Sequence, residues 1–278
     1  MIKQVVKSYA KLNLGLKILN KRPDNYHNLN SIFIRINLHD TLTFIPSDEF
    51  SIECNNAAVP SDTTNTIYKA FNILNKNYKI DTTFKIKLHK SIPLESGLGG
   101  GSSNAATTLI TLNQLNNLKL NKQELITIAK QVGSDVPFFI EGGIKQIQGV
   151  GDIIYNYSAP ILKSLKFILV FPQFSISTAW AYKKIKKTLH NHIDSNKFPA
   201  LDEYVDWKLF DNDFEKVVGS AYPEIFEIKE VLLNNGALYS GLSGSGSTMF
   251  GLYNDTVSLD KVQSLLSQYQ TNIAFPII

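Results

Sequence analysis

The residues whose types and spacing point most strongly to a binding site form a glycine-rich loop, which reads PLESGLGGGSSNA from Pro93. Glycines let a backbone approach a ligand closely, and the first N–H groups of a following helix are unpaired at its positive dipole end. A Walker A loop would need Lys after the last glycine, and the dinucleotide-binding pattern would need glycine at Ser102. Three glycines followed at once by Ser102, Ser103 and a helical stretch are not typical of a linker. The loop therefore predicts a phosphate-binding site.

A second glycine loop reads GLSGSGS from Gly241 and lies between two strand-like stretches. Alone, it is equally typical of a glycine-rich hairpin. Together with the first loop, it suggests two backbones that close on one ligand.

Lys11 and Asn13 belong to a segment, AKLNLGL, whose polarity alternates with period two. In a strand this spacing places three leucines on one face, which we expect to be core, and Lys11 and Asn13 on the other. Taken in isolation, such a pair is more often exposed to solvent than functional.

Two further segments carry polar groups that a ligand could use. The stretch RPDNYH is a turn by its Pro, Asp and Asn, and it ends in Tyr26 and His27, which could stack on or hydrogen-bond a planar ligand. Asp135 precedes Pro137 in an apolar stretch, where a carboxylate needs a purpose or a partner. The alternative is that Asp135 is the N-cap of a short helix from Val136.

Together, segments 10–14, 93–105 and 241–247 resemble the three signature motifs of the GHMP small-molecule kinases, such as galactokinase, homoserine kinase and mevalonate kinase. Segments 24–27 and 133–137 resemble one branch, which uses ATP to phosphorylate the C2 hydroxyl of a cytidine diphosphate substrate in the non-mevalonate route to isoprenoid precursors. The match runs almost end to end. Asn25 replaces a usual glycine, which Asn tolerates because it accepts positive φ, and Ser96 replaces a small apolar residue.

The resemblance implies an α+β, two-domain GHMP kinase fold with the active site in the interdomain cleft. We expect an N-terminal domain at 1–157, with the phosphate loop and the catalytic Lys and Asp, and a C-terminal domain at 158–278.

The resemblance also implies roles for individual residues. Asp135 is the general base, and Lys11 lies near it and the acceptor hydroxyl, where it keeps the carboxylate ionised and offsets charge on the transferred group. The cofactors are ATP and Mg²⁺, and Ser102 or Ser103 is expected to help place the metal, whose ligands the sequence does not identify. The expected nucleotide contacts are Asn65, Pro93, Gly97, Leu98, Gly99, Gly100, Gly101, Ser102, Ser103 and Gly244. The expected substrate contacts are Asn13, Tyr26, His27, Thr178 and Tyr182.

Tyr26 and Tyr182 are expected to clamp the cytosine, with His27 at the edge of the base. The alternative for Tyr182 is that it packs in the core.

Three other functions are compatible with parts of the sequence. Another GHMP kinase would share both glycine loops but not the Tyr26–His27 turn. A non-catalytic nucleotide-binding regulator of the same fold is disfavoured because Lys11 and Asp135 are both present. A basic nucleic-acid-binding protein is disfavoured because the only arginines are Arg22 and Arg35, and guanidinium is the usual reader of phosphates and bases.

The strands and helices expected along the chain alternate without strict βαβ order, which favours an α+β fold. Strands are expected at 3–18, 31–45, 83–89, 144–157, 166–171 and 272–275, with a strand pair at 237–253. Helices are expected at 64–77, from the first glycine loop to about 116, from an Asn121 N-cap to Gly133, and at 178–189, 211–218, 223–234 and 258–269.

Composition bounds the class of protein. With 278 residues, 44% hydrophobic and 19% charged, the chain can bury a real core. A net charge of +4 does not prescribe a polyanionic partner, and no apolar run approaches the roughly 20 residues of a membrane span. The single cysteine, Cys54, excludes an internal disulfide, so we expect a cytoplasmic protein that acts on a small molecule, with no nucleic-acid or membrane partner. The oligomeric state is not set by the sequence.

Overall fold

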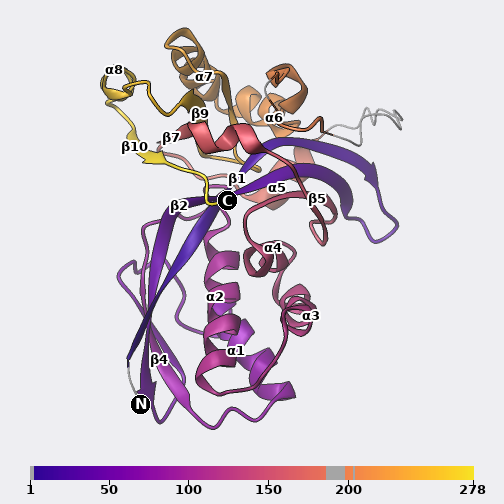
Figure 1. Cartoon of the computed structure of the whole chain (residues 1–278), viewed down its shortest axis with the longest axis vertical. Helices are drawn as coiled ribbons and strands as arrows, with labels where there is room; N and C mark the ends of the chain where they lie inside the picture. Colours follow the sequence, from indigo (N-terminus) through magenta and orange to yellow (C-terminus); the bar gives the residue numbers. More distant parts are fainter. Residues whose placement is uncertain (1–2, 186–197, 203) are drawn as a thin grey trace. The chain divides into compact units, whose positions relative to one another are not determined.

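The computed structural model describes residues 3–185, 198–202 and 204–278 (Figure 1). They form two compact units. Unit one comprises Met1–Ala10, Leu38–Ile92 and Gly99–Gly142, and unit two comprises Lys11–Asn37, Pro93–Leu98 and Gly143–Ile278. These units interleave along the chain, whereas the expected domains 1–157 and 158–278 are continuous, and a boundary at 157 stays a prediction.

Two long paired strands, β1 (Gln4–Lys21) and β2 (His27–Ser47), contribute residues to both units. They are the expected strands 3–18 and 31–45, each longer than predicted. The turn between them contains Asn25 at φ 68°, the positive value that an Asn tolerates.

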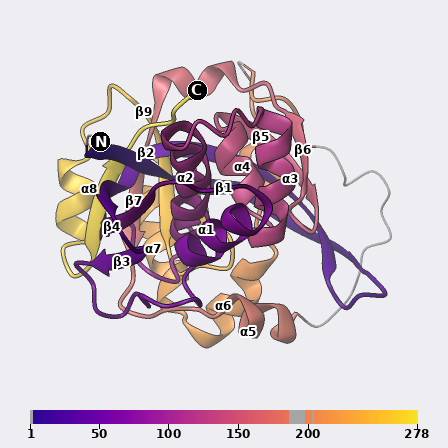
Figure 2. The ribbon, with the colours of Figure 1, turned by 90° about the horizontal axis from the view of Figure 1, so that it is seen from below.

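Unit one combines strands with four helices. Residues 41–47 of β2 pair antiparallel with β4 (Thr83–His89), which pairs in parallel with β3 (Ser51–Cys54). The helices are α1 (Thr66–Asn77), α2 (Gly100–Leu115), α3 (Lys122–Val132) and α4 (Val136–Glu141), which Figure 2 shows gathered side by side.

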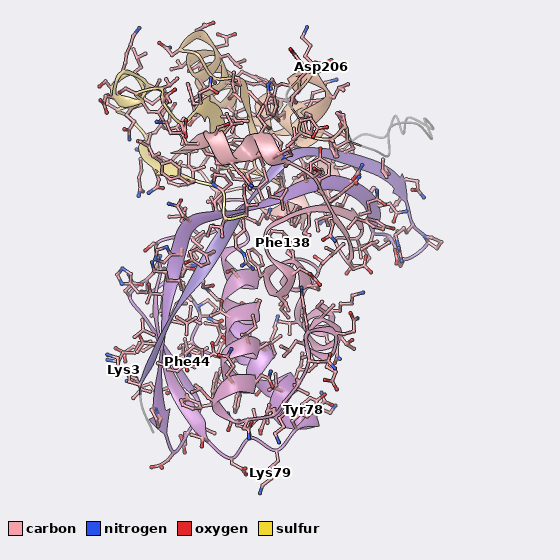
Figure 3. All side chains as sticks on the ribbon, viewed as in Figure 1. Lys3, Phe44, Tyr78, Lys79, Phe138 and Asp206 are labelled. Atoms are coloured by element: carbon pink, nitrogen blue, oxygen red, sulfur yellow. The ribbon has the colours of Figure 1, made fainter. Side chains whose placement is uncertain are left out.

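The core of unit one follows from apolar periodicity. In α1 the buried residues are Ile67, Ala70, Phe71 and Leu74, the spacing of one helix face. Phe44 of β2 and Phe138 of α4, both labelled in Figure 3, are fully buried in this unit.

Unit two contains a four-stranded antiparallel sheet in the order β10 (Gln270–Ala274), β7 (Leu165–Phe171), β9 (Met249–Asn254), β8 (Tyr239–Leu242). Residues 29–34 of β2 pair with β5 (Ile144–Gly149), which pairs with β6 (Ile153–Asn156). The helices are α5 (Thr178–Lys184), α6 (Phe214–Ala221), α7 (Glu224–Asn234) and α8 (Asp260–Leu265), with 3-10 turns η1 (Pro160–Ser164) and η3 (Trp207–Phe210).

Most predicted elements are present, and the α+β class is confirmed. Asn121 and Glu124 form the expected capping box of α3. The helix expected at 211–218 begins only at Phe214, because Asp211 and Asp213 pair with the backbone of Leu16 instead. The strand β3 was not predicted, and the part of the expected helix 178–189 beyond residue 185 lies outside the described residues.

Candidate functional site

Lys11 and Asn13 are buried, with exposed fractions of 4% and 1%. The leucines on the other face of this part of β1 are buried too, so the strand has no solvent face here. The solvent-facing interpretation of the pair is therefore wrong. Period-two alternation identified the two faces correctly but could not show that both are covered.

The Lys11 ammonium is held by several groups of unit two. It donates a hydrogen bond to the carbonyl oxygen of Gly97 at 2.7 Å and another to Asn13 Oδ1, and it lies 4.7 Å from the centre of the Phe33 ring. A buried charge is costly unless it is paired and hydrogen-bonded. These contacts fix one cation beside the first glycine loop.

The two glycine loops meet at Gly97, as the sequence suggested. Gly97 has φ 76°, and a Cβ placed on it would lie 2.0 Å from the carbonyl oxygen of Ser243. Ser243 Oγ donates to the Gly97 oxygen at 3.1 Å and accepts the N–H of Asn13 at 3.2 Å. The second loop is also a hairpin turn, since it joins the antiparallel strands β8 and β9. The hairpin interpretation of that loop is therefore confirmed, the two loops are in contact, and their closing on one ligand stays a prediction.

In unit one, the first glycine loop becomes the start of α2. Gly99 is the N-cap at φ 69°, a left-handed conformation that favours glycine, and the helix begins at Gly100. The N–H groups of the first turn have no partner within the helix and carry its positive dipole end. This is the geometry that binds phosphate groups at helix N-termini.

Ser102 and Ser103 have different surroundings. Ser103 is 2% exposed, and its hydroxyl donates to the carbonyl oxygen of Tyr9 at 2.6 Å and lies 2.8 Å from Ser8 Oγ. Its N–H bonds the Gly99 oxygen at 2.9 Å. Ser103 therefore anchors α2 to β1, and Ser102 is the better candidate for contact with a nucleotide or metal.

We expect Gly100→Val to abolish nucleotide binding. A Cβ at Gly100 would lie 3.0 Å from Lys90 Nζ and 3.1 Å from Ile92 Cγ2, and the branched side chain would block the approach of a phosphate to the first turn of α2. Titration of ATP against the variant, with circular dichroism to verify its fold, measures the loss. A folded variant with undiminished ATP affinity would remove the phosphate-loop assignment.

Asn65 is 7% exposed and is the N-cap of α1. Its Oδ1 accepts the N–H of Ile67 at 2.9 Å, and its Nδ2 donates to the Pro60 oxygen at 2.6 Å. The next residue, Thr66, donates its hydroxyl to the Gly101 oxygen at 2.7 Å. The start of α1 thus lies against the start of α2, while the Asn65 amide is occupied in capping. A nucleotide contact of Asn65 stays a prediction.

Asp135 occupies the N-cap position of α4, yet its side chain caps no backbone N–H. Its backbone is in the right-handed helical region, at φ −83° and ψ −13°, rather than in the extended conformation of a typical cap. The alternative that Asp135 serves α4 as an N-cap therefore lacks its defining hydrogen bond.

The aromatic residues expected to bind the base lie in unit two. His27 and Tyr182 stack on each other, with ring centres 5.5 Å apart and planes 18° apart, and Phe214 meets Tyr182 edge-on at 5.0 Å. Tyr26 is 66% exposed, in a turn where Arg22 pairs with Asp24 and lowers the pKa of that carboxyl. Tyr182 also packs on the hydrophobic core of unit two. Tyr182 therefore contacts His27 and Phe214 directly, and the clamp of Tyr26 and Tyr182 on a base stays a prediction.

Thr178 begins α5, and its hydroxyl lies 3.0 Å from Ser245 Oγ of the second glycine loop. Gly244 of the same loop lies close to the first motif, since a Cβ on it would be 3.2 Å from Asn13 Oδ1 and 3.5 Å from Lys11 Nζ. The structure therefore brings together Lys11, Asn13, Gly97, Gly244 and, through Ser245, Thr178.

Comparison with known proteins shows what this arrangement belongs to. The model of the GHMP kinases N terminal domain matches residues 65–143, and that of the GHMP kinases C terminal domain matches residues 193–270. The chain belongs to the GHMP kinase family. It is 39% identical to a 4-diphosphocytidyl-2-C-methyl-D-erythritol kinase of Prosthecochloris aestuarii, over 94% of this chain and 93% of the relative. It is 38% identical to one of Thermoanaerobacter pseudethanolicus, over 99% and 96%.

Solved structures agree with this placement. A 4-(cytidine 5'-diphospho)-2C-methyl-D-erythritol kinase superimposes with a TM-score of 0.79 at 25% identity, over 98% of this chain and 99% of that chain. A homoserine kinase from Cytophaga hutchinsonii, at 17% identity and a TM-score of 0.73 over 100% and 97%, shows the shared fold. This GHMP kinase therefore has the two-domain α+β fold that its motifs implied.

A buried carboxylate that the sequence analysis missed is bonded to helix α2 of this GHMP kinase. Asp40 is fully buried in unit one and pairs with Lys90. Its carboxylate accepts hydrogen bonds from the backbone N–H groups of Ser91 and Ile92, at 2.8 and 2.9 Å. It also accepts a hydrogen bond from Nδ2 of Asn104 in α2, at 2.9 Å. Its sequence signal was an aspartate within the β-branched run of β2, where a carboxylate needs partners.

Two kinds of feature are absent from the part of the GHMP kinase that the structure describes. No group of three or more His, Cys, Asp or Glu side chains is arranged to hold a metal ion. Among the same residues, no helix has the length and apolarity of a membrane span.

Proposed function

We propose that this protein transfers the γ-phosphoryl group of ATP to the C2 hydroxyl of 4-diphosphocytidyl-2-C-methyl-D-erythritol, giving the 2-phosphate and ADP in non-mevalonate isoprenoid precursor biosynthesis. The observation that carries the proposal is the seating of Lys11 against both glycine loops, through Gly97 and Gly244. Relatives that are 36–40% identical over most of the chain bear the name of this kinase, which supports the substrate.

Phosphoryl transfer requires positioning, charge neutralisation and a group that takes the proton of the acceptor. In our proposal, Asp135 removes the proton of the C2 hydroxyl. The oxygen of that hydroxyl bonds to the γ-phosphorus of ATP, and the bond between the γ-phosphorus and the oxygen that leaves with ADP breaks. Lys11 offsets the charge of the transferred group. The first-turn N–H groups of α2, at Gly100, Gly101 and Ser102, hold the phosphates.

Mg²⁺ fits the donors present. In kinase sites this ion is held largely by substrate phosphates and waters, with one or two protein groups, so a site of three protein carboxylates or imidazoles is not required. We assign the Ser102 hydroxyl as the protein group, because that of Ser103 bonds Tyr9. When bound, the ion would neutralise phosphate charge.

The base of the substrate is proposed to be recognised by Tyr26, His27 and Tyr182, with Asn13 and Thr178 as further contacts. Because the His27 and Tyr182 rings are already stacked, a cytosine stacks on the outside of this pair or separates it. The exposed Tyr26 ring can supply the other face. We further propose that the enzyme works in the cytoplasm on this small molecule, without a nucleic-acid partner.

ADP release from ATP, measured with a panel of alcohols, tests the function. The panel contains the cytidine diphosphate substrate, homoserine and mevalonate, with ATP alone as the background. We expect turnover only with the cytidine diphosphate substrate. Turnover of another alcohol would instead indicate a different GHMP kinase, and ATP binding without turnover of any of them would indicate a regulator. RNA binding at physiological salt would support the nucleic-acid alternative.

We expect Tyr26→Ala and Tyr182→Ala each to raise the KM for the cytidine diphosphate substrate by roughly tenfold to a hundredfold, since base–aromatic stacking contributes about 1 to 3 kcal/mol. The KM for ATP should change little. Tyr182→Ala should also lower the melting temperature, because this ring packs on the core. Tyr26→Ala should leave the melting temperature unchanged, because the Tyr26 ring is exposed.

Steady-state kinetics and thermal melts of both variants separate the two roles of Tyr182. Tyr182→Phe is the matched control, because it keeps the ring and should keep the KM. A Tyr182→Ala enzyme with a lower melting temperature and an unaltered KM would show that this residue only packs. Equal losses for ATP and the alcohol would refute the clamp for both residues.

A further inference from the structure

Asn212 is a buried polar residue that the motifs do not include. It is 3% exposed and lies one residue before Asp213, the N-cap of α6, in unit two. Its Nδ2 donates to the carbonyl oxygens of Leu242 and Gly244, at 2.7 and 2.8 Å, and its Oδ1 accepts the N–H of Phe214 at 2.9 Å. An Asn side chain has two N–H donors, and here both are used on the second glycine loop.

The backbone around Asn212 is fixed to the strand that carries Lys11 and Asn13. The backbone N–H of Leu16 donates to the carbonyl oxygen of Asp211 at 3.2 Å, and the backbone N–H of Asp213 donates to the carbonyl oxygen of Leu16 at 2.9 Å. This pairing is why residues 211–213 are not helical. It places Asn212 between β1 and the second glycine loop, with hydrogen bonds to the loop from its side chain and to β1 from its neighbours.

The loop that Asn212 holds touches the groups assigned to phosphoryl transfer. Ser243, between the two bonded carbonyl groups, bridges the Asn13 N–H and the Gly97 oxygen. Gly244 is so close that a Cβ on it would lie 3.5 Å from Lys11 Nζ. A change in the direction of the Leu242 or Gly244 carbonyl would therefore move the loop against Lys11.

We propose that Asn212 is a positioning residue for phosphoryl transfer, which keeps the second glycine loop seated on Asn13, Gly97 and Lys11. The expected effect on kcat rests on the proposed function, whereas the expected effect on the second glycine loop does not. Glu215 assists by accepting the Leu242 N–H at 3.0 Å, while its other oxygen pairs with Lys229 at 2.5 Å. Glu215 holds only the end of β8, whereas Asn212 reaches into the loop itself.

The test compares Asn212→Ala and Asn212→Asp with the wild type in two measurements. Asn212→Asp keeps the size and the acceptor for Phe214, but it presents an oxygen to the two carbonyl groups in place of the donors. We expect both variants to lose about tenfold to a hundredfold in kcat, because small displacements of positioned groups cost up to about a hundredfold. The KM for ATP should change less than threefold. Amide hydrogen exchange of peptides covering 241–248 should rise, with no rise in α7.

Asn235→Ala is the matched control. Asn235 is a partly buried Asn of the same unit whose Nδ2 also donates to a backbone oxygen, that of Val231 at 2.8 Å, at the end of α7. The Asn235→Ala variant should lower the melting temperature by the amount expected for the loss of one hydrogen bond, and it should leave kcat unchanged. A merely structural role for Asn212 would make its variants behave like this control.

The outcomes are distinguishable from those of the proposed function. Wild-type kcat in folded Asn212 variants, or unchanged exchange in 241–248, overturns the inference while the wild-type enzyme still turns over its substrate. A wild type without turnover would overturn the proposed function instead. Exchange of 241–248 would still decide whether Asn212 holds the loop.

Discussion

Asp135→Asn should reduce turnover with the cytidine diphosphate substrate by roughly a hundredfold or more, the usual cost of removing a general base. The substitution preserves the size of the side chain and removes its basicity. Nucleotide affinity should change little, because in our assignment the phosphates are held by α2 and not by Asp135. Single-turnover kinetics, together with ATP titration, measures the two effects separately.

The alternative role of Asp135 makes the opposite prediction. Asn caps helices about as well as Asp, so a mere N-cap would tolerate this change with near wild-type turnover. Asp206 provides the matched control, since it is the N-cap of η3 and its side chain does accept a backbone N–H, from Lys208 at 3.1 Å. Asp206→Asn should leave turnover and melting temperature nearly unchanged. The same result for Asp135 would refute the proposed mechanism.

Local sequence patterns predicted the elements well because their signals are local. The capping box at Asn121 and the strand 83–89 each depend on residues within a few positions of one another. The sequence also predicted a helix directly after the first glycine loop, and α2 begins at Gly100, although the residue type alone does not show that Gly97 and Gly99 adopt positive φ while Gly100 does not.

Burial of the polar residues could not be read in the same way. Lys11 and Asn13 are covered by partners such as Gly97 and Ser243, which are distant in sequence. The same holds for Asp40, whose four donors come from residues at least 50 positions away. A sequence shows that such a group needs partners but does not show which ones it has.

Side-chain roles within a motif were equally beyond the sequence. Ser102 and Ser103 are adjacent and chemically identical, yet helix geometry turns the Ser103 hydroxyl to Tyr9 of β1. Asn212 has no motif of its own, and its function depends on two carbonyl groups 30 and 32 residues away. Which ring stacks on Tyr182 was also set by tertiary packing, which brings His27 against it.

Gly97→Ala should lower kcat/KM by about a hundredfold or more. This loss is larger than the backbone strain of an alanine at positive φ would cause by itself. Positive φ costs an alanine about 1 kcal/mol. The added methyl group would also lie 2.0 Å from the Ser243 oxygen, so the second glycine loop must move away from Gly97. That movement displaces the two acceptor and donor contacts that Ser243 makes with Asn13 and Gly97, and it releases the carbonyl that holds Lys11.

Gly236→Ala separates strain from displacement. Gly236 belongs to the same unit and has φ 88°, but a Cβ there meets nothing within 4 Å. It should therefore lower the melting temperature through strain alone and retain wild-type kcat/KM. If Gly97→Ala lowered the melting temperature as Gly236→Ala does and kept its activity, the contact between the two glycine loops would have no part in catalysis. A selective loss of activity in Gly97→Ala would instead show that the loops must stay in contact for Lys11 to act.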